Sequence, residues 1–109
     1  RLEQIFEQLG HTPRATKCKA MEGLIEEAAK LIEEQGDPAI KDAALIAAAQ
    51  RVEHYEMAAY GAARTYAELL GYHQAAEALD RTLDEEKMAD EKLNDLALSE
   101  VNPAAQTKG

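Results

Sequence analysis

Hydrophobic residues recur at helical spacing in four stretches of this chain. The pattern predicts four helices, over residues 1–9, 17–35, 38–70 and 74–98. Gly10, Gly36 and Gly71 follow the first three stretches, and glycine is the usual residue just beyond a helix C-terminus. The third stretch also has a strong start signal, because Asp37 can cap free backbone amides and Pro38 suits the first helical position. The chain is therefore predicted to be all-α.

The sequence also predicts the extent of the domain and the nature of the two chain ends. Residues 1–98 are predicted to form a single helical domain. Asn102-Pro103 is expected to close the last helix, which leaves residues 99–109 as a small, polar and flexible tail. The chain begins with Arg1 and is already at helical spacing there, so we expect it to start inside a helix of a longer protein.

The two longest stretches carry seams in which apolar or small residues alternate three and four positions apart. Such seams predict helices that pack side by side at a shallow angle. The first seam is Leu45, Ala49, Val52, Glu56, Ala59, Ala63, Tyr66 and Leu70. The second is Ala76, Leu79, Leu83, Glu86, Asp90, Leu93 and Ala97. Only the short turn 71–73 separates the two helices, so they must fold back as an antiparallel hairpin, half or more of a helical bundle.

Carboxylates occupy seam positions where leucine is expected. If His73 is taken as the middle of the turn, Glu56 and Asp90 lie equally far from it and Glu86 lies one helical turn closer. The three side chains should therefore meet at about one level of the core. Glu53, one turn from Glu56, lies at the edge of the same face and can lean in.

Several anions in one apolar seam need a neutralising partner, because burial of an unpaired carboxylate costs several kcal/mol. Protons, a buried Lys or Arg, or a metal ion can supply it, and Lys87 beside Glu86 is the nearest basic candidate. Oxygen ligands at helical spacing suit iron or manganese, and di-metal carboxylate sites are built in bundle cores. Neither long helix has the Glu-x-x-His spacing of many di-iron sites. His54 is expected to be exposed, pointing away from the seam.

The amino-acid composition bears on the secondary structure, on the binding partners and on the location of the protein. Alanine occurs 22 times, whereas Val, Ile and Thr together occur 12 times, which favours helix over strand. The 21 acidic and 12 basic residues give a formal net charge of −9, a poor match to nucleic acids or anionic membranes. The single cysteine, Cys18, cannot form an internal disulfide and is expected to be a small buried hydrophobe. No signal peptide or membrane span is recognisable, and we expect a cytoplasmic protein.

Three segments resemble the YciE/YciF-like stress-protein family. They are Cys18-Lys-Ala-Met-Glu-Gly-Leu-Ile-Glu-Glu, the stretch from Asp42 to Gly61, and Leu83-Asp-Glu-Glu-Lys with the following Asp90-Glu-Lys-Leu. The Glu-His-Tyr-Glu block at 53–56 is a specific part of this likeness, which extends from Arg1 to about Ala97.

The resemblance implies a ferritin-like antiparallel bundle, a fold that usually holds a di-metal site. It also implies a role in bacterial stress responses and a further segment before Arg1 with the first helix and most of the second. On this view residues 17–35 form the crossover, and the chain's metal ligands are Glu53, Glu56, Glu86 and Asp90. The division of roles between Glu53 and Glu56 stays open.

Our preferred interpretation is a stress-response protein that binds iron or manganese through these carboxylates. Any chemistry would then be metal-centred oxidation or peroxide handling. The main alternative is a helical scaffold without metal, whose seam carboxylates are protonated or paired with basic groups. A storage module within a larger shell is a third reading. We also expect a homodimer or higher homo-oligomer, because an incomplete bundle leaves apolar surface uncovered.

Overall fold

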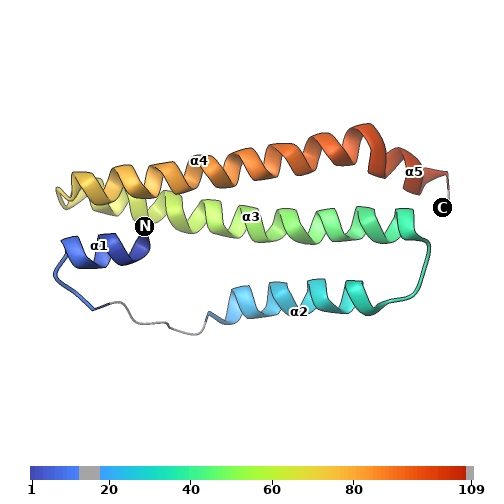
Figure 1. The fold of residues 1–109 in the computed structure, drawn as a ribbon, viewed down its shortest axis with the longest axis horizontal. Coiled ribbons are helices and arrows are strands. Elements are labelled where there is room, and N and C mark those ends of the chain that lie inside the picture. Colours follow the sequence, from blue (N-terminus) through green and yellow to red (C-terminus); the bar gives the residue numbers. More distant parts are fainter. Residues whose placement is uncertain (13–17, 108–109) are drawn as a thin grey trace.

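The computed structural model describes residues 1–12 and 18–107. Its elements in chain order are α1 (Leu2–Gln8), α2 (Lys19–Glu33), α3 (Pro38–Leu69), α4 (His73–Leu96), a π-helix η1 (Ala97–Val101) and α5 (Asn102–Gln106). These residues include no β-strand, and α3 and α4 lie side by side as an antiparallel hairpin (Figure 1). The predicted all-α bundle is confirmed. None of the described helices is long and apolar enough to cross a membrane.

The two ends of α3 follow the predicted signals. The Asp37 carboxylate accepts a hydrogen bond of 2.9 Å from the Ala39 N–H, and Pro38 occupies the first helical position. At the other end the Tyr72 N–H donates to the Ala67 carbonyl at 2.8 Å, around Gly71 with φ +82°. This is a Schellman motif, in which glycine adopts the left-handed conformation without steric strain. The chain therefore reverses within three residues.

The predicted seam of α4 is confirmed, because all seven of its residues are buried or half-buried. The predicted seam of α3 holds from Leu45 to Glu56 but is wrong at Ala59, which is exposed, and near the turn, where Tyr66 and Leu70 are exposed and Ala67 is buried instead. A straight α-helix drifts by about 20° per heptad from a strict seven-residue repeat. Over the length of α3 this drift is enough to bring a neighbouring residue to face α4.

A cluster of buried apolar residues from three helices lies at the turn end of the hairpin: Ile5, Ala67, Ala75, Ala76 and Leu79. Further buried apolar residues lie farther from the turn: Ile46, Ala48, Leu83 and Ala97. The small alanines allow the backbones of α3 and α4 to approach closely. Arg1, at the start of α1, donates a hydrogen bond of 3.0 Å to the Thr82 hydroxyl and pairs with Glu85, which fastens α1 to α4.

Helix α2 packs along α3 and is less deeply buried than predicted. The predicted start at Lys17 lies outside the described residues, and the helix ends at Glu33 instead of Gln35. No residue of α2 is buried. Met21, Ile25, Ala28 and Ile32 recur at helical spacing and predict an apolar stripe on this helix. The prediction is wrong at Ile25 and Ile32, which are 58% and 60% exposed. The half-buried apolar side chains are Met21, Leu24, Ala28 and Leu31.

The chain stays helical beyond the predicted end of the fourth helix at Leu98. The π-helix Ala97–Val101 leads into α5, which has Pro103 in its first turn and packs against α3. Pro103 has no N–H to bond to the carbonyl one turn back, and the wider π-helical turn stands immediately before it, where the regular hydrogen-bond ladder is already interrupted. The predicted boundary at Leu98 is therefore wrong, while the flexibility of residues 99–109 stays a prediction.

Cys18 is exposed rather than buried, which corrects the sequence prediction. Its Sγ lies 2.9 Å from the Tyr55 hydroxyl and so links the start of α2 to α3. The hydrogen bond from Tyr55 is the main reason that the pKa of Cys18 is lowered, and backbone N–H groups of Met21 and Ala20 add to the effect. The same contact raises the pKa of Tyr55.

Truncation of the core should destabilise the hairpin. We expect Leu79→Ala to lower the free energy of unfolding by about 2–5 kcal/mol, because it leaves a cavity beside Ile5 and Ala76. Met88→Ala on the same helix is the control, since Met88 is 57% exposed, and should change stability by less than about 0.5 kcal/mol. Urea unfolding followed by circular dichroism measures both. Equal losses would contradict this core assignment.

The Tyr55 hydroxyl should govern the reactivity of Cys18. A lowered thiol pKa means a larger thiolate fraction at neutral pH, and the thiolate is the nucleophile. We expect Tyr55→Phe to raise the pKa of Cys18 and to slow its alkylation by iodoacetamide near pH 7. The pH–rate profile should converge with that of the unsubstituted chain at high pH, where both thiols are ionised. Identical profiles at all pH values would show that the contact has no effect.

Candidate metal centre

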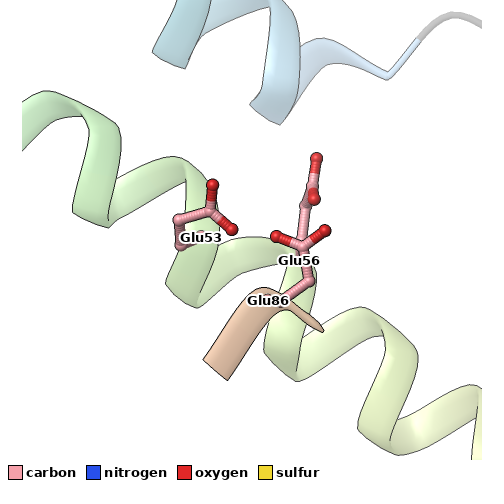
Figure 2. A group of neighbouring side chains, drawn as sticks. All are labelled: Glu53, Glu56 and Glu86. Atoms are coloured by element: carbon pink, nitrogen blue, oxygen red, sulfur yellow. The ribbon is translucent and has the colours of Figure 1, made fainter. Parts of the chain in front are cut away.

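Three carboxylates meet between the two helices of the hairpin. Glu53 and Glu56 belong to α3 and Glu86 to α4, and one oxygen atom of each lies within 4.8 Å of the others (Figure 2). We refer to these three residues as the carboxylate triad. Each of them is half-buried. The triad contains three of the four residues that the sequence singled out.

The turn explains which carboxylates meet. Its centre is Gly71, two residues before the position assumed from the sequence, and Glu56 and Glu86 lie fifteen residues to either side of it. Since both helices rise by the same amount per residue, these two side chains are level. Asp90 lies one helical turn further from Gly71 than Glu86, and it is outside the triad. Its predicted level with Glu56 is therefore corrected by about one turn.

Asp90 faces a different partner. Its Oδ1 lies 3.1 Å from Nε2 of His54, which is close to the same level of the hairpin. The side chain of Asp90 is 21% exposed and that of His54 is 64% exposed, so His54 is exposed as predicted. The atom Asp90 Oδ1 is buried, yet it receives no hydrogen bond among the described residues. The two groups thus make a close contact that is not a well-directed hydrogen bond.

The triad lacks a counter-charge within the part of the chain that the structure describes. No Lys, Arg or His there forms an ion pair with Glu53, Glu56 or Glu86. Lys87, the basic candidate from the sequence, is exposed on α4. Buried Oε2 of Glu53 has no hydrogen-bond partner among the described residues. Unit charges at this spacing repel by about 1 kcal/mol in water and by roughly 4 kcal/mol at an effective dielectric constant of 20.

This arrangement fits a hard divalent cation. Carboxylate oxygens are the ligands that manganese and ferrous ions accept readily, and an oxygen that is buried without a partner is available to coordinate. The three donors come from two helices, α3 and α4, that pack side by side. Whether Glu53, Glu56, Glu86 and Asp90 are ligands stays a prediction.

Sequence reasoning missed one contact of this region, the approach of His54 to Asp90. The helical-wheel argument placed His54 nearly opposite the seam; its exposure is as predicted, but its imidazole reaches Asp90 of the facing helix, so the predicted direction is wrong. With the turn centred on Gly71, His54 and Asp90 come to nearly equal heights, so the signal was present in the turn glycine. Tyr60, one turn after Glu56, packs against the cluster of buried residues at the turn end.

Comparison with known proteins shows which family this chain belongs to. The chain is 52% identical to the protein YciF of Escherichia coli over 109 residues, which are 99% of this chain and 66% of that protein. It superposes on the crystal structure of the E. coli stress protein YciF with a TM-score of 0.87 and 53% identity, covering 93% of this chain and 64% of that one. A structure of YcfI from Rhodopseudomonas palustris, which has been proposed to be a structural protein, matches with a TM-score of 0.81 and 45% identity, covering 85% and 59%.

The chain thus spans just under two thirds of the length of the relatives it matches. Residues 1–106 match the family described as a domain of unknown function, DUF892. With more than half of its residues identical to those of YciF and the same helical arrangement, this chain belongs to the DUF892 family and is a homologue of the stress protein YciF.

Proposed function

We propose that this chain supplies carboxylate ligands to an iron or manganese centre of a ferritin-like bundle that serves in bacterial stress defence. The observation that carries the proposal is the carboxylate triad, whose oxygens lie within 4.8 Å of one another and include a buried Glu53 oxygen without a partner among the described residues. Repulsion between the three anions favours any ligand that brings positive charge to them.

The roles of the residues follow from their positions. Glu53, Glu56 and Glu86 would bind the metal directly, and Asp90 is the candidate for a further ligand. A bridging role suits Glu56 or Glu86, because these two residues are level on facing helices. A bound iron or manganese ion would supply Lewis acidity and one-electron chemistry toward oxygen or peroxide.

The physiological part of the proposal rests on the relatives. YciF of E. coli is described as a stress protein, and 93% of this chain superposes on its structure. A role in the cytoplasm, in handling metal or peroxide under stress, agrees with the acidic composition and with the triad. The proposal concerns metal binding, and enzymatic turnover is not part of it.

A helical scaffold without metal is the second candidate function. It is favoured by the proposed structural role of YcfI, to which 85% of this chain is similar. On this reading the triad would be neutralised by protons or by basic groups from a partner. The two functions differ in what replacement of a triad carboxylate does to stability.

Metal should stabilise the fold through the triad. We expect Mn(II) or Fe(II) at about 100 times its Kd to stabilise the native state by about 2.7 kcal/mol, which raises Tm by roughly 10 °C. Glu56→Gln should abolish most of this shift, because it removes one anionic ligand without changing side-chain size. Anaerobic differential scanning calorimetry of the full chain measures both. Glu91→Gln is the matched control, because it removes the same charge from an exposed position on α4, and it should leave the Tm shift intact.

The scaffold reading makes the opposite prediction for an apolar substitution. If no metal binds, Glu56→Leu should stabilise the fold by about 1–4 kcal/mol, since it removes like-charge repulsion from a half-buried position. A melting curve that does not change with stoichiometric metal, together with this gain, would contradict the metal proposal.

We also propose that the chain associates with a second copy of itself. Large apolar side chains are exposed at both ends of the described structure, including Leu69 and Leu70 at the hairpin turn, 79% and 71% exposed, and Ile32 on α2. Such side chains favour burial against another surface. Sedimentation velocity at micromolar concentration should therefore give a dimer or larger species. A well-folded monomer under these conditions would contradict the association.

A further inference from the structure

The contact between His54 and Asp90 separates one acidic side chain from the three that gather beside it. Glu86 and Asp90 are four residues apart on α4, so their side chains leave the helix on the same face, about 5–6 Å apart at Cβ. Glu86 joins the carboxylate triad, whereas Asp90 Oδ1 lies 3.1 Å from His54 Nε2. Neighbours on one face of one helix therefore have different partners.

The contact holds Asp90 only weakly. Oδ1 is buried and receives no hydrogen bond among the described residues, although the imidazole nitrogen lies within contact distance. His54 itself is 64% exposed, so water competes for its nitrogen. A carboxylate in this position lacks a full replacement for the hydrogen bonds it would make to water.

A different rotamer of Asp90 would bring it toward Glu86. Rotation about χ1 moves the carboxylate between staggered positions that differ by 120°, and Glu86 is its neighbour on the same face. Two oxygens that share one divalent ion at bond lengths of about 2.1 Å lie no more than about 4 Å apart. This separation is within reach of side chains one helical turn apart.

We infer that His54 is a positioning residue that holds Asp90 outside the carboxylate triad and competes with a bound cation for it. The inference rests on the proposed metal centre and deepens it, because it names the residue that sets whether three or four carboxylates of this chain coordinate. In the absence of a cation the contact removes a fourth negative charge from the triad, where repulsion is already present. When a cation neutralises the triad, that reason disappears and Asp90 becomes the fourth ligand.

The test is a titration of the full chain with Mn(II), in which free Mn(II) is followed by electron paramagnetic resonance. His54→Ala should bind Mn(II) about two- to five-fold more tightly than the unsubstituted chain, since an exposed pair of this kind is weak. His54→Gln retains an N–H donor and should lie near the unsubstituted value. His73→Ala, an exposed histidine at the start of α4, is the matched control and should leave the affinity unchanged.

A double-substitution cycle shows whether the effect passes through Asp90. In an Asp90→Asn background, where the fourth anionic ligand is absent, His54→Ala should have no effect on Mn(II) affinity. An equal gain in both backgrounds would overturn the inference, because it would reflect only the general field of the imidazole. Weaker binding by His54→Ala would also overturn it, since His54 would then be a ligand itself.

The outcomes separate this inference from the proposed function. If the unsubstituted chain binds no Mn(II), the proposed metal centre fails and the role of His54 fails with it. If the chain binds Mn(II) and Glu56→Gln weakens the binding, but His54→Ala does not tighten it, only the role of His54 is overturned.

Discussion

The turn at Gly71 determines which residues of α3 and α4 face one another. Its left-handed backbone, with φ +82°, lets Tyr72 bond back to Ala67, and the two helices then run antiparallel with fixed register. A shift of the turn by two residues would place a different residue of α4 opposite Glu56. The level of the carboxylate triad and the contact between His54 and Asp90 both depend on this one position.

Electrostatic repulsion within the triad opposes the packing that the turn imposes. The hairpin is stabilised at its turn end by a small core of Ile5, alanines and Leu79, and by Arg1, which fastens α1 to α4. Further from the turn, polar and charged side chains enter the interface, and Oε2 of Glu53 is buried there without a partner among the described residues. A region of this kind contributes little to stability, and such regions often carry function.

The helices are buried to unequal extents. The seam of α4 faces α3 along its whole length, whereas α2 covers α3 from one side and buries none of its own residues. Ile25 and Ile32 on α2 are exposed, and so are Leu69 and Leu70 at the hairpin turn. An amphipathic helix buries its apolar face only where a neighbour is present, so the apolar pattern of α2 could be read from the sequence but the surface that covers it could not.

Much of the secondary structure and topology of this protein could be predicted from its sequence, because the local signals lie in short stretches of residues. Helical periodicity, the Asp37-Pro38 start of α3 and the glycine at its end predicted an antiparallel hairpin with carboxylates in its seam, and the family resemblance agreed with it. The tertiary structure decided what depends on register and on neighbours. It determined that Tyr66 is exposed and Ala67 buried, that Cys18 contacts Tyr55, and that the chain remains helical beyond Leu98. It also brought Glu53 together with Glu56 and Glu86, and it placed Asp90 in contact with His54. The burial of Ala67, the carboxylate triad and the contact of Asp90 with His54 follow from the centre of one turn and from the slow drift of a 3.6-residue helix against a seven-residue repeat, which act across the whole hairpin. The contact of Cys18 with Tyr55 and the helix beyond Leu98 depend on how α2 and α5 pack against α3, which no single segment shows.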